Sequence, residues 1–179
     1  MSIIFLAGVH GVGKGYLGSL VADELKILHR TASQLIREEK GRDTWDKEKL
    51  VVDVEENQLA LILAINRLCE TNETVLLDGH FVLRDKDGKF VRIAQDVFAE
   101  LNLAQVIVLS EDSHLIAERI KLRDGLAVTA ASVAALAVEE ESHAHDICRA
   151  LGIKLTLLKS PDGPILKRVV SRILKNIKA

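Results

Sequence analysis

An apolar segment runs directly into a glycine-rich loop and then into a helix at the start of this chain. Residues 3–7 are Ile-Ile-Phe-Leu-Ala, and the motif G-x-x-x-x-G-K extends from Gly8 to Lys14. Residues 14–25 follow with apolar side chains at helical spacing. Glycines in such a loop let backbone N–H groups converge on phosphate oxygens, and the helix N-terminus adds partial positive charge. The motif therefore predicts a binding site for a nucleoside triphosphate.

This loop contains most of the candidate contacts to ATP. Lys14 is the candidate catalytic residue that would reach the β- and γ-phosphates. The other candidate contacts are Gly8, His10, Gly11, Val12, Gly13, Gly15 and Tyr16. Gly15 stands where such motifs carry a serine or threonine for Mg²⁺, and the hydroxyl of Tyr16 lies far from the backbone. We therefore expect Mg²⁺ to be held by ATP phosphates, water and an acidic residue.

Strand and helix patterns alternate along the rest of the chain. Predicted strands cover residues 26–30, 75–78, 104–109 and 153–158, and predicted helices cover residues 33–40, 46–71, 93–101, 113–123, 129–150 and 165–177. An Asp-Gly turn between two short apolar runs predicts a hairpin over residues 81–93. The alternation predicts a three-layer α/β/α fold with a five-stranded parallel sheet and the ligand at the carboxyl ends of the strands.

Composition favours one domain with a buried aliphatic sheet. The chain has 179 residues, of which 48% are hydrophobic and only 3% are aromatic, as expected for a parallel sheet covered by helices. A net charge of −2 argues against an extended nucleic-acid surface. Cys69 and Cys148 lie in apolar helical patterns, which predicts buried, reduced thiols. We see no signal peptide and no apolar run of membrane-spanning length, so we expect a cytoplasmic protein.

Several landmarks occur in the order found in adenylate-kinase-type nucleoside monophosphate kinases. After the glycine-rich loop come residues 31–37 (TASQLIR), residues 76–80 (LLDGH), the hairpin and residues 119–124 (RIKLRD). The helix that follows contains HAHDICRA and ends near a glycine. The chain resembles this family of P-loop proteins over most of its length, with the greatest likeness to the archaeal-type adenylate kinases.

The resemblance implies ATP-dependent phosphorylation of a nucleoside monophosphate in the presence of Mg²⁺. It implies that Arg37 binds the phosphate of the acceptor and that His80 and Arg149 also contact the acceptor. It further implies one domain over residues 1–179, with an acceptor-binding insertion at about 31–72 and a lid region at about 119–150. Such proteins are monomers or small homo-oligomers with nucleotide substrates as partners.

Three further residues have side chains suited to phosphoryl transfer. Arg119 and Arg123 are four positions apart and share one helix face, where they could clamp the moving phosphoryl group. Asp78 ends a buried strand and could bind Mg²⁺ through water or orient the acceptor. A metal site at Glu139, His143 and His145 is disfavoured, because His145 lies on another helix face and a solvated helix explains these residues.

Three departures from the adenylate-kinase pattern keep two alternatives open. His10 replaces a common proline, Tyr16 replaces threonine, and Gln34 stands where many members have an acid. The first alternative is a kinase for another acceptor, such as a nucleoside, a small alcohol or a polynucleotide 5′ end. The second is a regulatory module that binds ATP and hydrolyses it slowly.

Overall fold

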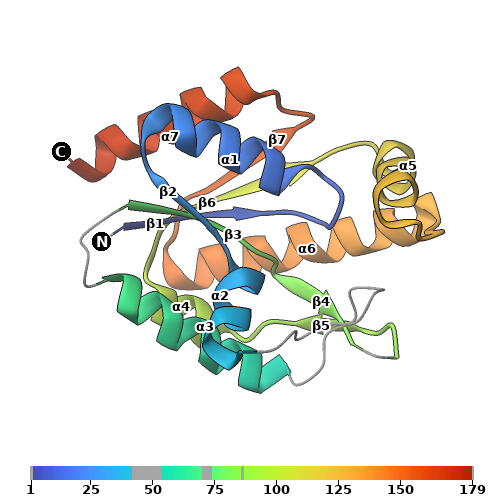
Figure 1. Ribbon diagram of the computed structural model, residues 1–179, viewed down its shortest axis with the longest axis horizontal. Coiled ribbons are helices and arrows are strands. Elements are labelled where there is room, and N and C mark those ends of the chain that lie inside the picture. Colours follow the sequence, from blue (N-terminus) through green and yellow to red (C-terminus); the bar gives the residue numbers. More distant parts are fainter. Residues whose placement is uncertain (1, 42–53, 70–73, 86, 179) are drawn as a thin grey trace.

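The molecule is built in three layers, with a sheet between two sets of helices (Figure 1). The computed structural model describes residues 2–41, 54–69, 74–85 and 87–178. The central sheet has five strands, and all of its pairings are parallel. The predicted three-layer α/β/α fold with a five-stranded parallel sheet is therefore confirmed.

The strands and helices follow the predicted alternation. The central strands are β1 (Ser2–Ala7), β2 (Leu28–Thr31), β3 (Thr74–Asp78), β6 (Leu103–Ser110) and β7 (Leu155–Lys159). An antiparallel hairpin is formed by β4 (Val82–Arg84) and β5 (Phe90–Arg92). The helices are α1 (Lys14–Leu25), α2 (Ala32–Lys40), α3 (Val54–Cys69), α4 (Gln95–Leu101), α5 (Ser113–Asp124), α6 (Ala130–Leu151) and α7 (Gly163–Lys178).

The order of the strands puts the glycine-rich loop at the centre of one sheet edge. The order is β2-β3-β1-β6-β7, so β1 lies between β3 and β6. The carboxyl ends of parallel strands meet at the same edge, where ligands of open α/β sheets bind. Figure 1 shows both chain ends on the left and the loop after β1 on the right. The end of β3, at Asp78, is therefore brought beside this loop, and Leu6 is its partner in the sheet register.

Alternate residues of β1 face opposite helical layers, because side chains in a strand have a period of two. Ile3 and Phe5 pack in one cluster with residues from α3, α4 and α6. Ile4 and Leu6 pack in a second cluster with residues from α1, α5 and α7. Both faces of the strand are thus buried, which explains why its sequence is continuously apolar.

Several element boundaries differ from the predicted ones. The second strand begins at Leu28 instead of residue 26, because Lys26 has a φ of 53° and caps the end of α1. The last strand begins at Leu155, two residues later than predicted, because Gly152 ends α6 in a left-handed conformation. Parts of the predicted helix 46–71, and of the implied insertion 31–72, lie outside the described residues.

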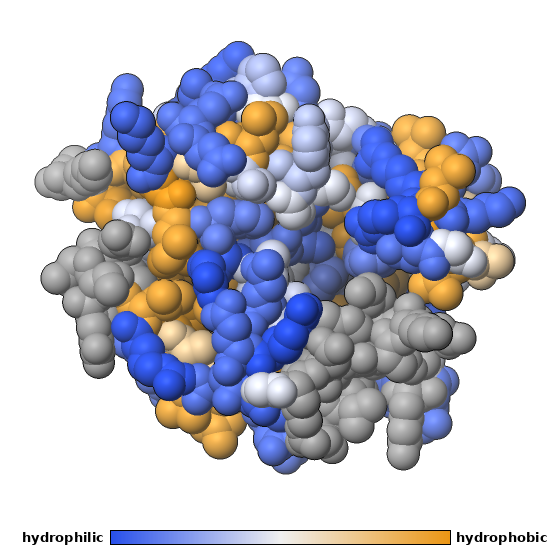
Figure 2. Space-filling view, viewed as in Figure 1, coloured by the Kyte–Doolittle hydropathy of each residue, from blue (hydrophilic) through white to orange (hydrophobic). Residues whose placement is uncertain are grey.

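The surface seen in Figure 2 is largely hydrophilic, with apolar groups scattered among polar ones. Apolar atoms reach the surface near α5, which carries Leu122 at 87% exposure and Leu115 at 45%. Among the described residues, no helix is both long and apolar enough to cross a membrane. Cys148 is buried as predicted, and burial raises the pKa of its thiol to about 11, while the Cys69 side chain lies outside the described ones.

Candidate active site

The start of α1 is shaped to receive an anion. Gly13 is its N-cap residue, with a φ of 106°, and no side chain caps the helix. By contrast, side chains of Thr31, Asp112 and Thr129 cap α2, α5 and α6. The first N–H groups of a helix have no partner within the helix and carry partial positive charge. The uncapped first turn of α1 therefore fits the phosphates of a nucleotide, as the motif predicts.

Lys14 lies buried beneath the loop. Its Nζ donates to the carbonyl oxygens of Gly8 at 2.6 Å and Val9 at 3.3 Å, and it lies 3.8 Å from Oδ1 of Asp78. Burial lowers the pKa of Lys14, while the negative charges of Asp78 and Glu140 oppose that change. The ammonium group is therefore held by carbonyls and a carboxylate at the point where phosphates would enter.

Asp78 is the carboxylate beside Lys14 of the phosphate loop. It is buried at the end of β3, and burial raises the pKa of its carboxyl group against the opposing effect of Lys14. A Cβ atom added at Gly15 would lie 3.7 Å from Oδ2 of Asp78, so the carboxylate borders the first turn of α1. Tyr16 is 75% exposed. The position of Asp78 is compatible with both of its predicted roles, which are to bind Mg²⁺ through water or to orient the acceptor.

The described residues contain no group of three or more His, Cys, Asp or Glu side chains that could hold a metal ion. Glu139 is paired with Arg92 at 2.9 Å. The expectation of a solvated helix is wrong for His143, which is buried and has its Nε2 2.7 Å from the carbonyl oxygen of Ile93. Its ring packs edge-on near Phe81, so His143 belongs to the core.

Position 8 requires glycine for two reasons, its backbone conformation and the close approach of a neighbouring residue. Its φ is 136°, and a Cβ atom there would lie 2.5 Å from the carbonyl oxygen of Leu109. We expect Gly8→Ala to lower the free energy of unfolding by about 3 kcal/mol or more, since backbone strain and this clash add.

The measurement for Gly8→Ala is urea unfolding. Gly152→Ala is the matched control, because Gly152 also has positive φ, 66°, but a Cβ there meets nothing within 4 Å. Its loss should stay near 1 kcal/mol, about the cost of a non-glycine residue in this conformation. Equal losses for the two variants would contradict the steric argument.

His10, Arg123 and Asp124 form a polar cluster that joins the loop to the end of α5. His10 Nε2 is 2.8 Å from Oδ2 of Asp124 and 2.6 Å from Nη2 of Arg123. Arg123 also donates from Nε and Nη2 to the Asp124 carboxylate, which holds the pKa of Asp124 well below its usual range. One ring nitrogen cannot donate to Asp124 and accept from Arg123 at once, so the tautomer of His10 selects its partner.

His80 and Glu140 lie close together beside Gly8, the first residue of the loop. Glu140 is 1% exposed, and its Oε1 is 3.8 Å from Nδ1 of His80. Burial lowers the pKa of His80 well below its usual value, with the positive charge of Lys14 adding to the effect. His80 is therefore neutral at neutral pH and can serve as a hydrogen-bonding group beside Asp78.

One cleft of about 950 Å³ contains the loop, Asp78, His80 and Arg123. One part of its wall, the apolar compartment, is formed by Ile36, Leu61, Val82, Leu83, Ile93, Val97, Phe98 and Leu101. Polar side chains at the same end are Ser33, Asn57, Gln58, Arg84 and Asp87. The cleft therefore offers a phosphate-binding end and a mostly apolar end, with Asp78 and His80 between them.

Three of the predicted arginines do not line this cleft. Arg119 contacts Glu111 at 3.4 Å, at the end of β6. Arg149 is 82% exposed and pairs with Asp146 near the end of α6. Arg37 is exposed on α2. Arg119 is therefore not among the cleft residues beside the phosphate loop, and Arg37 and Arg149 are not among those at the proposed acceptor position, whereas Arg123 lines the cleft.

Two residues of the site were missed from the sequence. Arg84 lines the cleft, donates from Nη2 to the backbone oxygen and hydroxyl of Ser132 at 3.0 and 2.8 Å, and lies over the Phe90 ring. Glu140 receives a hydrogen bond from the N–H of Gly8 at 3.2 Å. Neither residue belongs to a short motif, because each reaches the site from an element distant in sequence.

Residues 7–134 match the AAA domain family, a range that contains the phosphate loop, Asp78 and Arg123. The chain belongs to the AAA domain family. No curated protein matches it in sequence.

Solved structures with the same fold as this AAA domain include several kinases. A gluconokinase from Sinorhizobium meliloti 1021 is 12% identical with a TM-score of 0.57, over 99% of this chain and 95% of that chain. A shikimate kinase from Acinetobacter baumannii, in complex with shikimate, is 18% identical with a TM-score of 0.61, over 98% and 94%. A shikimate kinase from Bacteroides thetaiotaomicron is 14% identical with a TM-score of 0.57, over 99% of each chain.

At these identities the likeness concerns the fold. The AAA domain family and these neighbours support the P-loop kinase fold, and they do not single out adenylate kinase. The family resemblance drawn from the sequence is thus supported at the level of the P-loop kinase fold.

Proposed function

We propose that this AAA domain is an ATP-dependent kinase for a small molecule. The observation that carries the proposal is that Lys14 and Asp78 lie at the junction of two ends of one cleft. One end has the uncapped helix N-terminus suited to phosphates, and the other is an apolar compartment for a second molecule. A site that only bound ATP would not need the second compartment.

In the proposed reaction, ATP supplies the phosphoryl group and the residues of the chain position it. Lys14 moves from the carbonyl oxygens of Gly8 and Val9 to the phosphates and neutralises charge as it develops. Arg123, at the cleft, adds a second positive charge. An acceptor oxygen forms the new bond to phosphorus while the bond to ADP breaks. If the acceptor is an alcohol, its proton goes to Asp78, whose raised pKa suits this role.

The acceptor that we propose to test first is a nucleoside monophosphate, with Mg²⁺ accompanying ATP. The apolar compartment suits a base, and Asn57 and Gln58 offer amide groups beside it. Arg84 supplies positive charge for the acceptor phosphate at this end. We propose the linker 125–129 as the moving part of the lid region, because Leu126 and Val128 line the cleft while α6 packs in the core.

A second acceptor class is an alcohol without a phosphate. The observation that favours it is the position of Arg37 and Arg149 outside the cleft. This leaves Arg84 as the described arginine of the apolar end, whereas a phosphate is commonly bound by several charged donors. The names of the structural neighbours, gluconokinase and shikimate kinase, support including hydroxy acids among the acceptors tested.

The test is phosphoryl transfer from Mg-ATP to a panel of ribo- and deoxynucleoside monophosphates, nucleosides and small hydroxy acids. Transfer to a monophosphate would support the first acceptor class, and transfer only to an alcohol would support the second. ATP binding without transfer to any acceptor would contradict the kinase proposal and favour a regulatory module.

Arg84 gives a test of the acceptor end. We expect Arg84→Gln to raise the KM of an anionic acceptor by about tenfold or more, because a charged hydrogen bond is lost, and to leave the KM of ATP nearly unchanged. Arg92→Gln is the matched control, since Arg92 lies on the same hairpin but pairs with Glu139 and Asp146. An unchanged acceptor KM in steady-state kinetics would show that Arg84 does not bind the anion.

A further inference from the structure

Glu140 is a buried carboxylate to which the proposed transfer chemistry assigns no role. It lies on α6 and is 1% exposed. Its Oε1 accepts from the N–H of Gly8 at 3.2 Å, and its Oε2 accepts from the N–H of Val82 at 2.7 Å. The N–H of Phe81 is shared between the two oxygens, at 3.0 Å from Oε1 and 2.9 Å from Oε2. Hydrogen bonds from three backbone N–H groups compensate for the burial of this charge.

The three donors come from two segments that form different ends of the cleft. Gly8 is the first residue of the phosphate loop, 132 residues from Glu140. Phe81 and Val82 directly follow His80 and lead into the hairpin, and Val82 lines the apolar compartment. One carboxylate therefore fixes the start of the phosphate loop relative to the entry of the hairpin.

The peptide groups around Gly8 extend this connection to Lys14. The N–H of Gly8 donates to Glu140, and its carbonyl oxygen accepts from Nζ of Lys14 at 2.6 Å. Phosphates that draw Lys14 away would remove this bond from Gly8, whose backbone also hydrogen-bonds to His80. Loss of the Lys14 bond would alter the contact between Gly8 and Glu140, and through Glu140 the contacts of the N–H groups of Phe81 and Val82.

We propose that Glu140 is a positioning residue that couples nucleotide occupancy of the phosphate loop to the hairpin at the acceptor end. This inference rests on the proposed function, because it assumes that the loop binds a nucleotide. Glutamine at this position would keep the shape of the side chain but would have one acceptor oxygen. Its amide NH₂ would face the N–H of either Gly8 or Val82, and it would also remove one of the two acceptors of the Phe81 N–H, so that the connection between the loop and the hairpin entry is weakened.

The experiment is residue-resolved amide hydrogen exchange of the full chain, with and without the ATP analogue Mg-AMPPNP and with no acceptor. In the unmodified protein we expect the analogue to slow exchange of the Phe81 and Val82 amides by about tenfold, because phosphates bound across the loop would replace the Lys14 bond and hold the Gly8 N–H on Glu140. In Glu140→Gln we expect the analogue to bind while this slowing falls to less than about twofold. The matched control, Glu139→Gln, removes a neighbouring carboxylate that pairs with Arg92 and should behave as the unmodified protein.

Equal slowing in Glu140→Gln and in the unmodified protein would overturn the proposal. If Glu140→Gln does not fold, Glu140→Asp keeps the charge on a shorter side chain, and retention of full slowing there would also overturn it. An unmodified protein that binds Mg-AMPPNP without slower exchange at Phe81 and Val82 would overturn the coupling by itself. Failure to bind the analogue at all would instead contradict the proposed function, so the two failures are distinguishable.

Discussion

The rate of phosphoryl transfer from Mg-ATP is expected to fall by at least about 100-fold when Lys14 is replaced by alanine. Lys14 is the buried cation of the phosphate loop, and its Nζ lies 3.8 Å from Asp78 in the ligand-free site. Removing it leaves the charge that develops on the transferring group without its nearest positive partner. Initial rates at saturating Mg-ATP, with the best acceptor from the panel, measure this loss.

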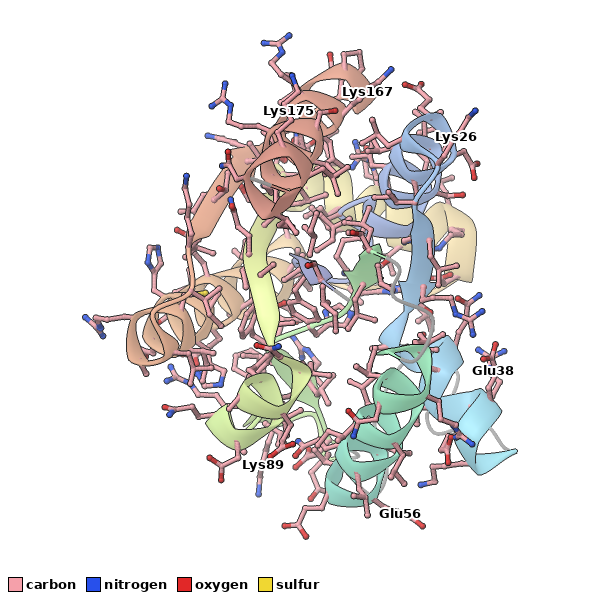
Figure 3. The ribbon with its side chains drawn as sticks, turned by 90° about the vertical axis from the view of Figure 1, so that its left-hand side faces the viewer. Lys26, Glu38, Glu56, Lys89, Lys167 and Lys175 are labelled. Carbon is pink, nitrogen blue, oxygen red and sulfur yellow. The ribbon has the colours of Figure 1, made fainter. Side chains whose placement is uncertain are left out.

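A lysine far from the cleft provides the control. Lys175 lies on α7, the helix at the top of Figure 3, and it is not among the residues that line the cleft. Lys175→Ala should keep the full rate. Thermal unfolding of both variants checks that the fold is retained. A Lys14→Ala protein that is folded and transfers phosphate at the original rate would contradict the assigned role of the loop.

Asp78→Asn is expected to lower the transfer rate by roughly 100-fold, because the carboxylate lies beside Lys14 and the first turn of α1. The rate should be measured over a range of Mg²⁺ concentrations. A loss recovered at high Mg²⁺ would assign Asp78 to the metal, and a loss at every concentration would assign it to the acceptor. Asp23→Asn, an exposed change on α1, is the control and should have no effect.

Asp78→Asn is also expected to change how the free energy of unfolding depends on pH. Burial raises the pKa of Asp78 in the folded protein, so the folded state binds this proton more tightly than the unfolded chain does. The contribution of Asp78 is therefore present at low pH and is lost as the pH rises through the raised pKa. Asparagine does not titrate, so urea unfolding of Asp78→Asn should lack this component. An unchanged pH profile would contradict the argument.

Features that depend on residues close together in the chain could be predicted from the sequence. The phosphate loop is one, because a strand, closely spaced glycines, Lys14 and a helix lie within one stretch of chain. The capping box of α2 is another, since Thr31 and Gln34 exchange hydrogen bonds across three residues. The alternation of apolar strands and amphipathic helices likewise predicted the parallel sheet, because burial on both faces leaves a continuous apolar run.

Which arginines reach the cleft could not be predicted from helical spacing alone. Arg119 and Arg123 share a helix face, yet Arg123 reaches the cleft and Arg119 turns to Glu111. Arg123 contacts His10 in the phosphate loop, whereas the partner of Arg119 lies at the end of β6. Helical periodicity gives the face of a residue but not the neighbours that the rest of the fold places there.

The phosphate loop, the three-layer α/β/α fold and the carboxylate of Asp78 at the end of a strand could all be predicted from the amino-acid pattern. Arg84 and Glu140, which complete the site from distant elements, became apparent only in the folded chain. Motifs and periodicity act over a few residues, whereas the contacts of these two side chains depend on strand order and helix packing. The bond between Glu140 and Gly8 spans 132 residues, so only the folded chain brings its two groups together.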